Sequence, residues 1–255
     1  MTTENLIGLF IVLLCTGLIF ALGVLRKDRP ARSLRSIRAI QQLRRAIGLA
    51  VEDGKGLHVS LGKASLLDPN NISALAGLCT LERLGQISMV SDHPPVATSG
   101  NGALAILSKD TLRAVYRSGN ALEQFDPDQG QLTGPTAFAY TAGTIPVVGD
   151  KQVYTNVLMG NFGPEAALLC DAADQKKTFA LAVSDSLPAQ SVFYAAAEES
   201  LIGEEMFALP AYLQAGPFHQ ASVQAQDLLR WVVIILMILG IIYKILDQLL
   251  GISLI

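Results

Sequence analysis

LIGLFIVLLCTGLIFALGVL, residues 6–25, is an unbroken apolar stretch, and a basic stretch follows it directly. Twenty residues in an α-helix span roughly 30 Å, the thickness of the hydrocarbon core of a bilayer. A cleaved signal peptide would carry its basic residues before the apolar stretch, whereas this chain begins MTTEN, without Lys or Arg. The sequence therefore predicts an uncleaved transmembrane helix over residues 6–25.

Residues 26–45 contain eight Lys or Arg and a single acid, Asp28. Because basic residues collect on the cytoplasmic side of transmembrane helices, we expect Met1 outside and Arg26 in the cytoplasm. The lipid bilayer is then a partner of the chain. The side chains expected at its surface are Arg26, Lys27, Arg29, Arg32, Arg35, Arg38 and, near the other end, Trp231.

A second apolar stretch, Trp231–Tyr243, is only thirteen residues long before Lys244 and Asp247 interrupt it. Continuing to the end gives enough length, so we predict a second transmembrane helix over residues 228–252, with both termini outside. A helix lying in the plane of the membrane is the alternative. The Lys244/Asp247 pair could form a helix–helix contact in an oligomer or two side chains reaching for the interface.

Residues 26–53 form a basic juxtamembrane segment that we expect to be largely helical. Its apolar residues recur at three- and four-residue steps, as in Leu34, Ile37, Ile40, Leu43, Ile47 and Ala50. The basic face could lie against anionic headgroups. The well-formed apolar face instead favours a connector helix that packs on the following domain.

Residues 54–219 alternate between strand-like and helix-like stretches about five times, which predicts an α/β domain with a doubly wound, mostly parallel, Rossmann-like sheet. TFALAV, residues 178–183, is apolar throughout, as a strand buried on both faces should be. The expected strands are 57–61, 86–90, 121–125, 152–159 and 178–183, with a polar loop at 126–133. The expected helices include 68–84, 101–118, 135–146, 163–173, 186–197 and 198–213.

The domain is acidic, because residues 46–229 contain nine Lys or Arg and nineteen Asp or Glu, a net charge of −10. A broad nucleic-acid-binding face is therefore not expected. Three cysteines form no disulfide framework and fit a reducing compartment. No metal-ligand spacing occurs, and neither a metal nor a cofactor is expected.

In such a sheet, ligands bind beyond the carboxyl ends of the strands. The candidate ligand-binding residues there are Lys63, Asp92, Ser99, Asn101, Asn161, Gly163, Asp185 and Ser186. The turns 98–102 and 160–163 are the best candidates for an anion site on backbone N–H groups. Both standard phosphate fingerprints are missing, and such turns often serve only to cap a helix.

Catalysis has the least support. The histidines are His58, His93 and His219, and no metalloprotease motif includes them. His58 alternates within an expected strand and is interpreted as a packed or surface residue. Asp185 stands between Ser184 and Ser186, but the GxSxG motif of serine hydrolases is absent.

The chain resembles an uncharacterised family of bacterial membrane proteins, a domain of unknown function. The matching stretches are GLHVSLG (56–62), SALAGL and LERL (73–84), FAYTAG (138–143), GNFGPEAALL (160–169), LIGEEMFALPAYL (201–213) and QDLLRW (226–231). The resemblance implies a two-span protein of the bacterial inner membrane and adds no reaction, cofactor or catalytic residue.

Two function classes remain. The first is a non-enzymatic, membrane-anchored scaffold or assembly protein, whose cytoplasmic domain self-associates as a homo-oligomer or binds a membrane-complex partner. The second is a membrane-tethered sensor that binds a small anionic ligand or nucleotide at the strand ends. An enzyme is a third and weaker possibility, since no nucleophile, base and orienting group can be assembled from spacing.

Overall fold

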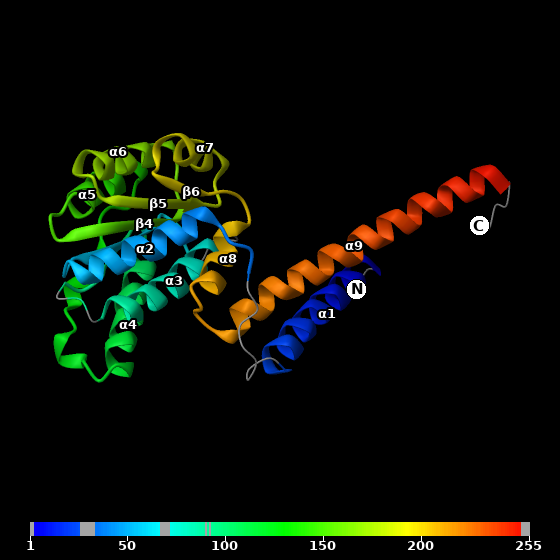
Figure 1. Ribbon diagram of the computed structural model, residues 1–255, viewed down its shortest axis with the longest axis horizontal. Coiled ribbons are helices and arrows are strands. Elements are labelled where there is room, and N and C mark those ends of the chain that lie inside the picture. The colour runs from blue at the N-terminus through cyan, green and yellow to red at the C-terminus, as the bar shows by residue number, and fades with distance from the viewer. Residues whose placement is uncertain (1–2, 26–33, 67–71, 90, 92, 251–255) are drawn as a thin grey trace. The chain divides into compact units, whose positions relative to one another are not determined.

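The structure, a computed structural model, describes residues 3–25, 34–66, 72–89, 91 and 93–250 (Figure 1). The chain divides into two compact units. One is the α/β domain, residues 33–215. The other comprises the two terminal segments, residues 1–32 and 216–255.

The domain is built on a six-stranded sheet in which every neighbouring pair is parallel, in the order β3-β2-β1-β4-β5-β6. The predicted doubly wound α/β fold is thereby confirmed. The strands are β1 (Gly56–Gly62), β2 (Val96–Ser99), β3 (Gly130–Leu132), β4 (Val153–Asn161), β5 (Phe179–Ser184) and β6 (Glu199–Leu201). Every residue of β1 and of β5 is buried, as expected for strands with helices on both sides.

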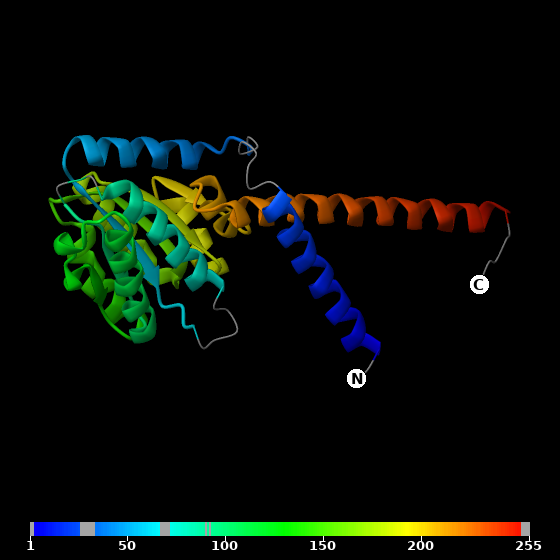
Figure 2. The same cartoon turned by 90° about the horizontal axis from the view of Figure 1, so that it is seen from below.

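Helices cover both faces of this sheet (Figures 1 and 2). One face packs against α2 (Arg38–Glu52), α3 (Ile72–Ser88), α4 (Gly102–Ser118) and α8 (Glu205–Tyr212). The other packs against α5 (Ala137–Val148), α6 (Ala167–Lys176) and α7 (Leu187–Ala196). Residues of β5 alternate between the two cores, with Leu181 in the first and Ala182 in the second.

The prediction of the second and third strands was wrong. Residues 86–88, expected to begin a strand, are the last turn of α3, whose buried face continues through Leu84 and Ser88; Val90 lies outside the described residues. The second strand is instead β2, which follows Pro95. Residues 122–124 form the short 3₁₀ helix η1 (Leu122–Gln124) rather than a strand. The third strand, β3, lies within the stretch predicted to be a loop.

The stretch 198–213 was predicted as one helix, and this was also wrong. It begins with the edge strand β6, turns at Gly203 with a positive φ of 70°, and only then forms α8. A glutamate, a serine and a leucine are too few to show the apolar periodicity that would identify β6. The strand exists because it pairs with β5, as in Val183 beside Leu201.

The connector helix α2 packs its apolar face on the sheet, through Ala39, Ile40, Leu43, Ala46, Ile47 and Ala50. Two of the predicted membrane-surface residues form ion pairs with acids of the same domain. Arg35 lies 2.9 Å from Glu205, and Arg38 lies 3.1 Å from Glu199, while both arginines remain largely exposed. Of the other basic residues predicted at the membrane surface, Arg26, Lys27, Arg29 and Arg32 lie outside the described residues.

The terminal unit contains two long helices, α1 (Thr3–Leu25) and α9 (Pro217–Leu250). Both are long and apolar enough to cross a membrane. They contact each other where the rings of Phe20 and Phe218 stack at 6.3 Å. The helix α9 begins well before the predicted span at residue 228, and Trp231 is exposed on it.

Candidate functional site

The carboxyl ends of the strands meet at one edge of the sheet, and β1 and β4 lie side by side at its centre. From β1 the chain continues to β2 on one side, and from β4 it continues to β5 on the other. Doubly wound proteins bind their ligands at such a switch point. The segments that follow β1, β2, β4 and β5 therefore form the candidate site.

The segments after β1, β2 and β4 are joined by their backbones. The N–H of Lys63 donates to the carbonyl of Asn161 at 2.9 Å, and the N–H of Gly100 donates to the carbonyl of Gly62 at 2.8 Å. Gly62 has a φ of +66°, and a Cβ on it would lie 2.4 Å from the Asn161 oxygen. Glycine is thus required here for close packing of neighbouring segments.

An ion pair fills the space beside this junction. Lys63 Nζ lies 3.1 Å from Glu165 Oε1, and the same oxygen accepts a 3.1 Å hydrogen bond from the Gly163 N–H. Glu165 belongs to the 3₁₀ helix η3 (Pro164–Ala166), and its side chain is only 7% exposed. Burial acts to raise its pKa, but hydrogen bonds from backbone N–H groups and the Lys63 ammonium outweigh burial and lower it.

Asn161 and Asp185 extend the same edge toward β5. The Asn161 amide donates to Asp185 Oδ1 at 3.0 Å. Ser186 uses its backbone N–H to bond the Ser184 hydroxyl at 3.2 Å, as the chain enters α7. The structure therefore brings Lys63, Asn161, Gly163 and Asp185 together around the switch point.

The turn after β2 serves as a helix cap. Asn101 Oδ1 accepts from the N–H groups of Ala103 and Leu104 at 3.0 and 3.2 Å. The Ser99 hydroxyl accepts from the Asn101 N–H at 3.1 Å. Both predicted residues thus use these groups to begin α4. The remaining candidate, Asp92, lies outside the described residues.

Sequence reasoning missed a buried polar network beneath this edge. His58, fully buried in β1, lies 2.9 Å from Asn156 Oδ1 and 2.9 Å from the Thr98 hydroxyl. Because the amide oxygen only accepts, His58 Nδ1–H donates to it and Nε2 accepts from Thr98. The Tyr140 hydroxyl bonds Ser60 and also accepts from the Gly62 N–H.

Burial lowers the pKa of His58 from 6.5 to about 4, which keeps the ring neutral. Burial likewise raises the pKa of Tyr140. Both ring nitrogens of His58 are used inside the network, so this histidine offers no free base to a ligand. Its position within the expected strand was the only sequence signal, and it suggested packing without identifying the partners.

Glu165 was also missed as a member of the site. In the sequence it stands after a proline at a helix start, where an acid commonly stabilises the first turn. Only the fold places its carboxylate against Lys63, 102 positions earlier in the chain. Within the part of the chain that the structure describes, no group of three or more His, Cys, Asp or Glu could hold a metal ion.

The protein combines an α/β domain, which has a six-stranded, doubly wound parallel sheet, with two helices of membrane-spanning length. The chain belongs to the family described as a domain of unknown function (DUF6754), whose model matches residues 1–255. The predicted membership in such a family is confirmed. No curated protein and no solved structure matches the chain.

Proposed function

We propose that this protein is a non-enzymatic, membrane-anchored assembly protein whose α/β domain binds a second copy through the carboxyl edge of its sheet. The observation that supports this function is a set of large apolar side chains exposed at element ends along that edge. Phe138 in the first turn of α5 is 72% exposed, and Leu187 at the start of α7 is 76% exposed. Ile72 and Leu132 are 59% and 54% exposed.

These residues are separated in sequence and share only their place in the fold. Each lies where a strand ends or where the following helix begins. Exposed apolar side chains that gather at one place commonly mark an interface, and aromatic residues are enriched in interface cores. The ion pair between Lys63 and Glu165 fills the switch point between them. Docking of another protein is therefore a better role for this edge than binding of a small ligand.

The two helices of membrane-spanning length, α1 and α9, favour a second copy of this chain as the docking partner. With α1 and α9 both in a bilayer, copies of the domain are confined to one membrane surface, which raises their effective concentration. The basic residues of 26–45 favour the cytoplasmic side for this surface, with both termini outside. In bacteria, as the family resemblance implies, this would be the inner membrane. The acidic domain is unsuited to nucleic acid.

Cysteine cross-linking in native membranes tests this proposal. In a background in which Cys15 and Cys79 are changed to Ser, Leu187→Cys should give cross-linked dimers, because the carboxyl edges face each other. Lys151→Cys is the matched control, since this exposed residue lies before β4 at the opposite edge. Equal cross-linking at both positions would remove the support for a specific interface.

A second candidate function, a sensor for a small anion, rests on the Lys63–Glu165 pair. The Glu165 carboxylate accepts from a lysine and a backbone N–H at the switch point, as a bound anion would. An anionic ligand would act by displacing this carboxylate. At 100 times its dissociation constant, a nucleotide should stabilise the protein by about 2.7 kcal/mol, and Lys63→Met should abolish that stabilisation.

A further inference from the structure

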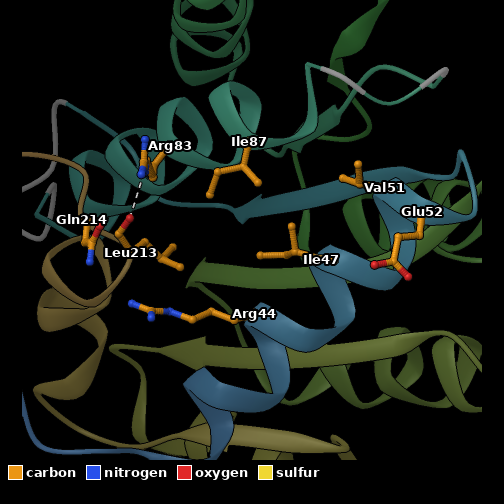
Figure 3. Close-up of a pocket in the computed structure, with 9 residues that line it drawn as sticks. Arg44, Ile47, Val51, Glu52, Arg83, Ile87, Leu213 and Gln214 are labelled. Atoms are coloured by element: carbon orange, nitrogen blue, oxygen red, sulfur yellow. Dashed lines mark hydrogen bonds between the residues drawn. The ribbon is translucent and has the colours of Figure 1, made fainter.

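A pocket of about 520 Å³ lies on the face of the domain covered by α2, α3 and α8, away from the switch point (Figure 3). It is bounded by α2 on one side, by α3 on the other, and by the segment that follows α8. A volume of this size suits a small organic molecule. None of the functions above uses this pocket.

Two arginines stand at one end of the pocket, Arg44 from α2 and Arg83 from α3. Arg83 Nε donates to the carbonyl of Leu213 at 2.8 Å, and Arg44 Nη2 donates to the carbonyl of Tyr212. These carbonyls hold both guanidinium groups toward the same end of the pocket. Each guanidinium has five N–H donors, so several remain for another acceptor.

Neither arginine forms an ion pair with a carboxylate among the residues that the structure describes. Two other arginines near Arg44 in the sequence differ, because Arg35 and Arg38 form ion pairs with Glu205 and Glu199. The domain has many more acids than bases, but the guanidinium groups of Arg44 and Arg83 hydrogen-bond to backbone carbonyls instead. Two such cations at one pocket end form a ready site for an oxyanion.

The middle of the pocket is apolar. Ile47 and Val51 line it from α2, and Ile87 and Leu213 line it from the other side. Gly48, which also lines the pocket, has open space beside it, since a Cβ there would meet nothing within 4 Å. The apolar part adjoins the arginine end, and Glu52 stands at the far end (Figure 3).

We infer that this pocket binds an organic anion that joins an oxyanion head to an apolar body. Arg44 and Arg83 bind the head, and Ile47, Ile87 and Leu213 contact the body. The ligand is either a soluble metabolite or the headgroup region of an anionic lipid, which share this chemistry. Gln214, which lines the pocket, precedes the membrane-length helix α9 by three positions in the sequence.

Calorimetric titration of phenyl phosphate into the full chain tests this site. The protein is held in nanodiscs of phosphatidylcholine, which carries no net charge. Phenyl phosphate combines an oxyanion with an apolar ring, whereas inorganic phosphate lacks the ring and benzyl alcohol lacks the charge. We expect phenyl phosphate to bind at least about tenfold more tightly than either, because both halves of the pocket contribute.

Three variants separate the pocket from general charge effects. Arg44→Gln removes one cation, and Gly48→Leu fills the open space without changing any charge. Each should weaken phenyl phosphate binding by about tenfold or more. Arg45→Gln is the matched control, because Arg45 is the next residue of α2, is exposed and does not line the pocket. Thermal unfolding of each variant checks that it is folded.

No binding of phenyl phosphate, or binding no tighter than that of both partial probes, would overturn the inference. So would an equal loss in Arg45→Gln and Arg44→Gln, or full binding in Gly48→Leu. Replacing part of the phosphatidylcholine with phosphatidic acid then distinguishes the sources. Weakened phenyl phosphate binding in these discs identifies a lipid headgroup as the occupant, and unchanged binding identifies a soluble anion.

Discussion

Lys63 Nζ and Glu165 Oε1 lie 3.1 Å apart, and this contact joins the segment after β1 to the segment after β4. The sheet is extended from β1 in one direction and from β4 in the other, so the two strands form a switch point. The ion pair therefore occupies the place where other doubly wound proteins bind a ligand. The Gly163 N–H adds a second donor to the same carboxylate. The centre of the carboxyl edge is thus closed by the chain itself.

Glu165→Gln should lower the free energy of unfolding by about 1–3 kcal/mol, because it leaves the partly buried Lys63 without a counter-charge. Its pH dependence follows from the lowered pKa of Glu165. A depressed carboxyl pKa stabilises the protein above pH 4.5 and loses this effect as pH falls through the folded-state value. Urea unfolding between pH 6 and roughly pH 3 should therefore show a shallower decline in the variant. Identical slopes would mean that the pair contributes nothing.

His58 should make the protein less stable as pH falls from 6.5 toward 4. The unfolded chain binds a proton on this ring near pH 6.5, whereas the folded protein resists until about pH 4. Stability from the neutral ring is therefore complete above pH 6.5 and falls by roughly 3 kcal/mol below it. His58→Gln should lack this pH-dependent fall, although it is less stable overall. A variant with the same pH profile as the natural protein would refute the assignment.

Two glycines should respond to alanine in opposite directions. Gly62→Ala should destabilise the domain by about 2 kcal/mol or more, because φ is positive there and the new Cβ would meet a backbone oxygen. Gly48→Ala should stabilise it by about 0.5–1 kcal/mol, since Gly48 lies inside α2 with open space around it. Thermal unfolding of the two variants measures the contrast. A stable Gly62→Ala variant would show that the junction between β1 and β4 is loose.

The proposed topology predicts opposite labelling of two positions in cells. A membrane-impermeant maleimide should label Thr3→Cys in intact cells, because the positive-inside rule places the N-terminus outside. Lys151→Cys, which lies in the α/β domain, should be labelled only after the cells are opened. Labelling of Lys151→Cys in intact cells would place the domain outside and reverse the topology.

The sequence was informative wherever a physical pattern was continuous. The strands β1, β4 and β5 and the helix α4, bounded by Asn101 and Gly119, were located by periodicity and capping, whereas α3, predicted to end at residue 84, continues to Ser88. The strands β2, β3 and β6 were missed, since they contain only three or four residues each. Pairing with a neighbouring strand forms them, and no local pattern records that pairing.

The candidate site shows the same division. The rule that ligands lie beyond strand ends selected Lys63, Asn161 and Asp185, which the structure joins by hydrogen bonds, and a ligand-binding role for them stays a prediction. It did not find Glu165, because a carboxylate that pairs across the sheet looks like an ordinary helix-start acid in the sequence. The arginine pocket was missed for a similar reason. Arg44 and Arg83 meet only after α2 and α3 pack on the same face.

The mass of the full chain in detergent micelles, compared between the natural protein and a Phe138→Glu/Leu187→Glu variant, tests self-association most directly. We expect the natural protein to be a homo-oligomer and the double variant to be a monomer. Higher salt should strengthen the natural oligomer, because it screens repulsion between acidic domains. Ile106→Glu, at an exposed position in the second turn of α4, is the control and should leave the mass unchanged. A monomeric natural protein, or an oligomer that survives both charges at the carboxyl edge, would contradict the account.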